Sequence, residues 1–457
     1  MKFSYKSPFI CVSIIFILMS CKEDIIGPMD PTDEFETLDE ELISYLKEKA
    51  PNGSVDYFSL PQSTDLQNIP ADPKNNLTSA KINLGKMLFH ETGIGIIPKN
   101  QNSAGTYSCA SCHHSKAGFQ AGIKQGIGEG GIGFGNNGEA RVVDEAYGFD
   151  FLDIQPIRSP SILNTAYQTV MLWNGQFGAT DVNIGTEDQW ALRSPKEINY
   201  LGFEGLESQA IAALKIHRLK VTEWIVEELG YKEHFDTAFP DIPAEERYND
   251  TIAGLAIAAY ERIVLADEAP FQLWLDGDAD AMTEQEKKGA ILFFGKANCV
   301  QCHTGPSLST TEFYALGMKD FSGEHISPTI AQDFFTSAQG RGGFTGDDND
   351  LYKFKVPQLY NLTDSPFYGH GGSFTSIEDV INYKNEAIAE NPAVPSEKLY
   401  SGFVPKNLTD EEVDQITAFV ENALYDPNLE RYVPESLPSG LCFPNNDEQS
   451  RMDLDCN

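Results

Sequence analysis

The chain has 457 residues, of which 41% are hydrophobic, so it is long enough for two or three domains with substantial cores. Its formal net charge of −35 at pH 7 excludes a nucleic-acid binder, because the phosphates would be repelled. The same charge would steer cationic partners toward the protein, although an acidic coat that only maintains solubility explains it equally well.

The first 21 residues have the form of a lipoprotein signal peptide. Lys2 and Lys6 precede the apolar run FICVSIIFILM, and the segment ends at Cys21. The run is short for spanning a bilayer, so the pattern favours export and lipid attachment at Cys21 over a single transmembrane anchor. We therefore expect a membrane-anchored lipoprotein facing the periplasm, with residues 22–75 as an acidic leader and tether.

Export changes how the other cysteines are interpreted, because thiols outside the cytoplasm become oxidised or are otherwise occupied. Cys11 is removed with the signal peptide, and four of the six cysteines after Cys21 belong to two C-x-x-C-H motifs. Cys442 and Cys456 remain. We expect them to form a disulfide within a C-terminal tail, residues 431–457.

A weak internal repeat precedes the two motifs. INLGKMLFHETG lies ahead of the first motif and EKKGAILFFGKAN ahead of the second, and both carry apolar residues at helical spacing. ESQAIAALKIHRLKVTEWIVEEL and NDTIAGLAIAAYERIVLAD are also helical by period, and Thr283 with Glu286 forms a helix-start signature. The glycine-rich GIGEGGIGFGNNG follows no predicted strand and is interpreted as a turn-rich loop. The sequence thus predicts a mainly α-helical protein with long loops, divided into residues 76–275 and 276–430.

Each C-x-x-C-H motif combines two thiols with an imidazole; the residues are Cys109, Cys112, His113, Cys299, Cys302 and His303. A zinc site needs four ligands in compact pairs, and a redox dithiol needs no histidine after its second cysteine. Haem attachment needs all three groups, since the thiols bond the vinyl groups and the imidazole reaches the iron. The motifs predict two covalent c-type haems in tandem cytochrome c-like domains, with His113 and His303 as proximal ligands. An electron carrier and an enzyme both stay open, because the sixth ligand decides between them.

Longer segments resemble the bacterial di-haem cytochrome c peroxidase family, which includes the methylamine-utilisation enzyme MauG. The resemblance runs from about residue 84 to residue 429 and rests on LGKMLFHETGIG, SCASCH, RSPSILNTAY, LWNGQF, LESQA, CVQCHTGP, FKVPQLYNL and FYGHGGSFTSIEDV. It implies that the N-terminal haem reacts with peroxide and the C-terminal haem accepts electrons. It also implies a tryptophan between the haems, for which LWNGQF nominates Trp173.

The peroxide pocket of this family has a Q-A-x-x-P segment followed by a glutamate that moves protons. Here LESQAIAALKIHRL keeps Gln209, which the resemblance implies orients peroxide. Ala213 replaces the proline, and Leu219 stands roughly in place of the glutamate. His217 lies on the same predicted helix, and an imidazole can perform the same proton transfer. Alternatively, His217 ligates the iron and keeps the haem closed until reduction.

Three further residues receive weaker roles. Glu204 and Glu207 are weaker candidates for proton transfer, because acidic residues are common near helix starts. His114 follows His113 directly and would point away from the same iron. We therefore expect it at the surface or beside a haem propionate.

The sixth ligand of the second haem departs from the family pattern. The family's peroxidases use a methionine fourteen residues after the histidine of a P-Y-x-H segment, and the methylamine enzyme uses a tyrosine. Counting from His370 reaches Lys384, with Tyr383 one residue earlier, and Met318 after His303 is the remaining candidate. A phenolate or an amine would stabilise ferric iron and lower the potential. That change would favour withdrawal of electrons from an oxidisable partner.

The resemblance also implies a calcium ion between the haems, bound partly by an asparagine just before the P-S-x-L-N stretch. Arg158 occupies that neighbourhood here, and a guanidinium disfavours a bound dication. Calcium binding would then depend on Ser365 and backbone carbonyls.

The sequence therefore predicts a di-haem c-type peroxidase that reduces hydrogen peroxide to water with electrons from a cationic cytochrome c or a similar donor. One alternative is a MauG-like oxidase that uses peroxide to oxidise a partner protein or small molecule. Another is a non-catalytic di-haem electron carrier. The family often dimerises, although no segment here marks a homodimer interface.

Overall fold

The computed structural model describes residues 1–2, 37–148, 151–322 and 331–456. Residues 3–20 of the predicted signal peptide, the predicted lipidation site Cys21 and residues 22–36 of the predicted leader lie outside these residues. Residues Thr37–Asn457 form one compact unit. In the described part of the chain, no helix has both the length and the apolar character needed to cross a bilayer.

Helices joined by long loops make up this unit, and strands are few and short. The helices are α1 (Leu38–Lys49), α2 (Ser79–His90), α3 (Gly205–Ile216), α4 (Glu223–Glu228), α5 (Lys232–Ala238), α6 (Ala244–Arg247), α7 (Asp250–Arg262), α8 (Pro270–Leu275), α9 (Glu284–Phe294), α10 (Ala331–Ala338), α11 (Arg341–Thr345), α12 (Ile377–Glu386), α13 (Asp410–Ala418) and α14 (Glu448–Asp453). The strands β1 (Gly131–Ile132) and β2 (Val142–Val143) pair antiparallel, as do β3 (Phe313–Tyr314) and β4 (Phe354–Lys355). The mainly helical fold class predicted from the sequence is confirmed.

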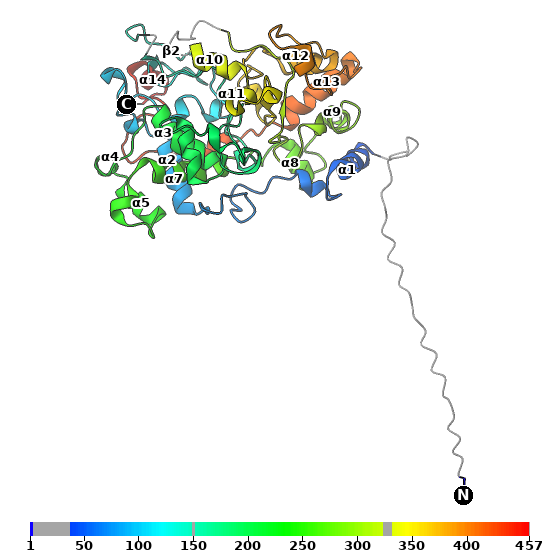
Figure 1. Ribbon diagram of the computed structural model, residues 1–457, viewed down its shortest axis with the longest axis horizontal. Coiled ribbons are helices and arrows are strands. Elements are labelled where there is room, and N and C mark those ends of the chain that lie inside the picture. Colours follow the sequence, from blue (N-terminus) through cyan, green and yellow to red (C-terminus); the bar gives the residue numbers. More distant parts are fainter. Residues whose placement is uncertain (3–36, 149–150, 323–330, 457) are drawn as a thin grey trace. The chain divides into compact units, whose positions relative to one another are not determined.

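Two helix crossings form the centre of the fold. α2 packs against α7, beside α3, and α9 packs against α13 (Figure 1). A Cβ on Gly85 of α2 would lie 1.8 Å from the carbonyl oxygen of Ala256, and one on Gly289 of α9 would lie 1.9 Å from that of Gln415. Each crossing therefore needs a residue without a side chain. Both glycines belong to the repeated segments. We call the part built around α2 and α7 the N-terminal lobe and the part built around α9 and α13 the C-terminal lobe. The exact domain boundary at residue 275 stays a prediction.

The repeat extends well beyond the motif segments. Asn164 and Asn361 each stand four residues after a proline and adopt left-handed backbone conformations, with φ of 59° and 52°. The amide of Asn164 donates to the carbonyl of Val264, and that of Asn361 donates to the carbonyl of Leu424. RSPSILN and FKVPQLYN therefore have equivalent structural roles in the two lobes.

Part of the predicted leader is folded. Thr37 and Glu40 form a capping box at the start of α1, and Leu42 and Leu46 are fully buried. α1 packs against α9. From Thr37 onward the chain therefore belongs to the compact unit and does not act as a free tether.

The C-terminal tail covers the first C-x-x-C-H motif. Cys442 and Cys456 are disulfide-bonded. Between them, the carbonyl of Pro444 accepts a hydrogen bond from Ser108 Oγ at 2.8 Å, and Asn445 Oδ1 accepts one from Ser111 Oγ. The tail thus contributes directly to the surroundings of the first motif.

Candidate haem sites and peroxide pocket

Both C-x-x-C-H motifs fold into the same short turn. Cys109–Ser111 and Cys299–Gln301 are single 3-10 turns, and the four thiols are free of disulfides. The amides of His113 and His303 donate to the carbonyl of the first cysteine of their motif at 3.2 and 2.9 Å. Each turn therefore presents two free thiols and one imidazole together.

The two histidines are oriented in the same way. Nδ1 of His113 donates to the carbonyl of Phe119 at 3.4 Å, and Nδ1 of His303 donates to that of Leu308 at 3.0 Å. Burial lowers the pKa of both imidazoles to about 4, so they are neutral at pH 7. With Nδ1 occupied as a donor, Nε2 is left to ligate a metal.

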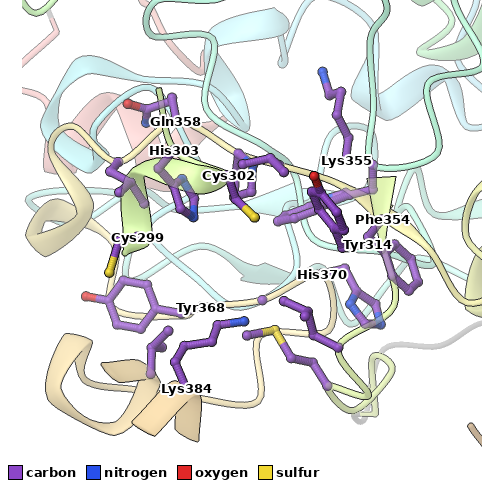
Figure 2. Close-up of a pocket in the computed structure, with 18 of the residues that line it drawn as sticks. Cys299, Cys302, His303, Tyr314, Phe354, Lys355, Gln358, Tyr368, His370 and Lys384 are labelled. Carbon is purple, nitrogen blue, oxygen red and sulfur yellow. The ribbon is translucent and has the colours of Figure 1, made fainter. Parts of the chain in front are cut away.

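A cavity of about 330 Å³ lies next to the second motif. Figure 2 shows Cys299, Cys302 and His303 on one side of it and Lys384 facing them from the other. Most of the surface of the cavity is apolar, as the lining residues Phe293, Ile381 and Val420 illustrate. Two thiols, a neutral imidazole and an apolar cavity fit a covalently attached haem.

The structure separates the three candidates for the sixth ligand. Lys384 and Met318 line the cavity, whereas Tyr383 does not. The Tyr383 hydroxyl instead donates to the carbonyl of Leu316 at 2.5 Å. Burial lowers the pKa of Lys384 to about 8, although the nearby cysteines raise it. No hydrogen bond or ion pair holds its amino group within the described residues, and a neutral amine is a competent iron ligand.

His217 lies at the C-terminal end of α3 and pairs with a carboxylate that sequence reasoning missed. Its Nδ1 lies 2.8 Å from Oδ2 of Asp153, which is 4% exposed at its side chain. The His217 side chain is itself 37% exposed; its partial burial lowers its pKa, but the charge and hydrogen bond of Asp153 outweigh this effect, so the pKa of His217 is raised. The charge of His217 in turn contributes to lowering the pKa of His113. The pair therefore lies near the first motif.

The glycine-rich loop positions this carboxylate. A Cβ on Gly128 would lie 2.5 Å from Asp153 Oδ2, and the amide of Gly128 donates to the carbonyl of Asp153 at 2.9 Å. The Arg141 side chain holds the same loop by donating to the carbonyls of Ile127 and Gly128. The stretch is a turn-rich loop, as expected, that also contains the two-residue strand β1, and Asp153 connects it to His217. Nothing local in the sequence pairs Asp153 with a histidine 64 residues away.

The other acidic residues have different surroundings. Glu204 and Glu207 bind the buried guanidinium of Arg262 at 2.9 and 2.7 Å, which makes them structural partners. Glu261 on α7 is 8% exposed, and burial raises its pKa to about 8, with a further contribution from Glu207. Glu261 also contributes to raising the pKa of Cys109, so this acid lies near the first motif. Sequence reasoning missed Glu261 because its helical position resembles that of a core residue.

Gln209 Oε1 and both ring nitrogens of His114 are buried and have no hydrogen-bond partner among the described residues. Gln209 is eight residues before His217 on α3, about 12 Å along the helix axis, so its role in orienting peroxide stays a prediction. His114 is 4% exposed and packs edge-on against Phe134, so its expected surface position is wrong.

Trp173 lies at the contact between the lobes. Its ring packs edge-on against His370, with centroids 6.4 Å apart. An antiparallel β-bridge joins Met171 to Phe177, and Trp173 lies in the loop between them. A second bridge joins Tyr368 to Phe374, with His370 in the corresponding place of its loop. The two rings therefore hold equivalent positions in the repeat. The indole Nε1 donates to the carbonyl of Arg158 at 2.8 Å. This placement is compatible with the predicted bridge.

The predicted calcium neighbourhood is filled by protein. The guanidinium of Arg158 donates to Ser365 Oγ and to the carbonyls of Ile123 and Lys124. Within the described residues, no group of three or more histidine, cysteine, aspartate or glutamate side chains could hold a metal ion. The residues present do not fit a calcium ion.

These features define a class of protein with two cytochrome c-like lobes, each carrying one haem-type motif. The model of the family "Di-haem cytochrome c peroxidase" matches residues 79–280. The chain is 26% identical to cytochrome-c peroxidase IdrP1 of Pseudomonas sp. (strain SCT), over 79% of this chain and 85% of the relative, and 25% identical to MauG of Methylorubrum extorquens, over 79% and 83%. It is also 27% identical to cytochrome c peroxidase Ccp of Escherichia coli (strain K12), over 86% of this chain and 69% of that relative.

A crystal structure of a MauG-like protein associated with microbial copper homeostasis has the same fold. It superposes with a TM-score of 0.54 and 24% identity, covering 81% of this chain and 95% of that one. Residues 79–280 of the chain therefore match the di-haem cytochrome c peroxidase family, and the chain is similar over most of its length to cytochrome-c peroxidases and to MauG.

Proposed function

We propose that this protein reduces hydrogen peroxide to water with two electrons from a donor protein. Each turnover would consume one peroxide, two electrons and two protons and release two waters. The observation that carries the proposal is the pairing of His217 with Asp153 near the first C-x-x-C-H motif. This pair supplies the proton-transfer group that Leu219, in place of the family's glutamate, cannot supply.

The first motif would hold the peroxide-reacting haem covalently through Cys109 and Cys112, with His113 as proximal ligand. When bound, the haem supplies the iron at which the O–O bond of peroxide is cleaved. Asp153 fixes the imidazole with Nδ1 as donor, so Nε2 of His217 is the atom that accepts a proton from one peroxide oxygen and delivers it to the other. Gln209 would orient the peroxide.

The second motif would hold the electron-accepting haem through Cys299 and Cys302, with His303 as proximal ligand. Lys384 is the sixth ligand that the cavity supports best, because its amino group faces the motif and Tyr383 is bonded elsewhere (Figure 2). Met318 is the alternative from the same cavity lining. Trp173 would carry electrons between the haems.

An oxidase is a second candidate, favoured by one observation. An amine ligand in place of a thioether stabilises ferric iron, which lowers the potential of the second haem. A low potential disfavours reduction by ordinary cytochromes and favours use of peroxide to oxidise a partner protein or small molecule. MauG belongs to a related branch of the family.

The location and assembly of the protein are part of the proposal. Lipid attachment at Cys21 would tether it to a membrane facing the periplasm, where a cationic cytochrome c is a suitable donor for a chain with a net charge of −35. A homodimer stays a prediction, which size-exclusion chromatography with light scattering would check.

Spectroscopy and turnover of the purified holoprotein test the function. We expect a high-spin ferric signal from the first haem, a spectral change on addition of peroxide, and steady oxidation of a reduced cationic cytochrome c. A long-lived oxidised state without turnover would support the oxidase function and contradict the peroxidase function. Two low-spin haems in every redox state, with no response to peroxide, would contradict both and leave an electron carrier.

A further inference from the structure

Arg158 is a buried arginine whose guanidinium lies between the two lobes, with only 1% of the residue exposed. Nη1 donates to the carbonyl oxygens of Ile123 and Lys124 at 3.0 and 3.1 Å, and Nη2 donates to Ser365 Oγ at 2.5 Å. Two further oxygens lie 3.4 and 3.5 Å from Nη2: Gln120 Oε1 and the carbonyl of Ala121. The charge therefore sits inside a shell of oxygens drawn from both lobes.

No carboxylate of the described residues neutralises this charge. Arg158 forms no ion pair within the described ranges of the chain, and its acceptors are carbonyl, amide and hydroxyl oxygens. Burial lowers the pKa of Arg158 to about 10, so the group is still charged at neutral pH. Backbone carbonyl and side-chain amide oxygens are among the ligands that calcium takes in proteins. The oxygens around the guanidinium therefore form a cation site, and the cation that fills it is the Arg158 side chain itself.

The same residue fixes the bridge tryptophan. Its carbonyl accepts the hydrogen bond from Trp173 Nε1 at 2.8 Å, and its amide donates to the carbonyl of His370 at 3.0 Å. The guanidinium also lies over the ring of Phe367, 5.2 Å from the centroid. Arg158 therefore joins the tryptophan, the loop after the first motif and the loop around His370.

Lys355 holds the equivalent position in the repeat, two residues before a proline, and supplies a matched control. Its amide donates to the carbonyl of Trp173 at 2.8 Å, and its buried amino group donates to the carbonyl of Val170 at 2.8 Å and to Gln168 Oε1. Those two oxygens do not form a calcium shell. Removing Lys355 would therefore delete an interlobe cation without opening a metal site.

We infer that the guanidinium of Arg158 is a built-in cation that replaces a divalent metal ion between the lobes and positions Trp173. The positioning role rests on the proposed function, whereas the cation site follows from the oxygen shell alone. Neither calcium nor its removal should then affect the wild-type protein.

Metal analysis of the holoprotein is the first test. We expect iron from both haems but calcium far below one per chain, and a thermal midpoint that neither EGTA nor added calcium chloride shifts. One calcium per chain that survives dialysis, or a midpoint that falls with EGTA, would overturn the inference. These readouts do not depend on turnover, so the peroxidase proposal can hold or fail separately.

Substitution is the second test. Arg158→Ala removes the cation and leaves its oxygens, so we expect a lowered thermal midpoint that calcium chloride restores by more than half. Calcium should also restore the rate of electron exchange between the haems, which a purely structural loss would not predict. Lys355→Ala should lower the midpoint without recovery by calcium. A calcium-insensitive Arg158→Ala, or equal shifts in both variants, contradicts the inference. Should Arg158→Ala not fold, Arg158→Lys, which retains a cation, must fold and stay calcium-insensitive.

Discussion

At the scale of single residues, chemistry is decided by partners that lie far away in the chain. The proposed proton-transfer role of His217 depends on Asp153, whose carboxylate lies 2.8 Å from its Nδ1. Tyr383 and Lys384 are neighbours on α12, about 100° apart around the helix. Which of the two faces the second motif therefore depends on how α12 is rotated against the C-terminal lobe.

Removing the Asp153 carboxylate should impair peroxide reduction. Asp153→Asn should lower kcat/KM for peroxide by about tenfold to a hundredfold, because the imidazole loses its orientation and its charge partner. Asp153 raises the pKa of His217, so activity rises with pH as His217 loses its proton, and this rise should move to lower pH in the variant. Stopped-flow pH profiles of the two proteins measure both effects.

Glu261 supplies the comparison for that experiment. Its burial and raised pKa make it the other acid near the first motif. Glu261→Gln should leave the pH profile of the wild type in place. If Glu261→Gln lowers the activity and Asp153→Asn does not, the proton-transfer role assigned to His217 is wrong.

Replacing Lys384 by methionine should raise the potential of the second haem. We expect an increase on the order of 100 mV in Lys384→Met, since a thioether favours ferrous iron. The low-spin electron paramagnetic resonance signal should change as well. Tyr383→Phe is the control and should leave both unchanged, because its hydroxyl donates to Leu316. An unchanged signal in Lys384→Met would favour Met318 over Lys384 as the sixth ligand of the second haem.

At the scale of elements, each lobe depends on a helix crossing at a glycine. Gly85 and Gly289 allow the backbones of paired helices to touch, which no residue with a Cβ permits at 1.8 or 1.9 Å. The second motif turn begins at Cys299, shortly after α9 ends at Phe294, so the crossing positions the turn that carries the second C-x-x-C-H motif. The same helix begins with the Thr283–Glu286 capping box that the sequence predicts.

Gly289→Ala should destabilise the protein despite the higher helix propensity of alanine. The added methyl group meets the Gln415 carbonyl, and we expect a loss of about 2 kcal/mol or more in the free energy of unfolding. Lys288→Ala, at an exposed position on the same helix, should change it by less than about 0.5 kcal/mol. Denaturant unfolding measures both, and equal effects would contradict a tight crossing.

At the scale of the whole molecule, charge should govern the encounter with a donor. The net charge of −35 attracts a cationic cytochrome, and salt screens that attraction. We expect kcat/KM for a cationic cytochrome c to fall about tenfold between low and physiological ionic strength. Turnover with a neutral small-molecule reductant is the control and should stay constant; a salt-insensitive cytochrome reaction would favour a different donor.

The sequence by itself determined whatever depends on local spacing. C-x-x-C-H fixes two thiols and an imidazole on one turn, helical periodicity predicts the helices, and the signature at Thr283 marks where one begins. Only the tertiary structure decided what depends on distant segments: Asp153 beside His217, Lys384 facing the second motif, and Arg158 inside a shell of oxygens from both lobes. The reason is physical, because hydrogen bonds and charges act over a few ångströms in space, whatever the separation along the chain.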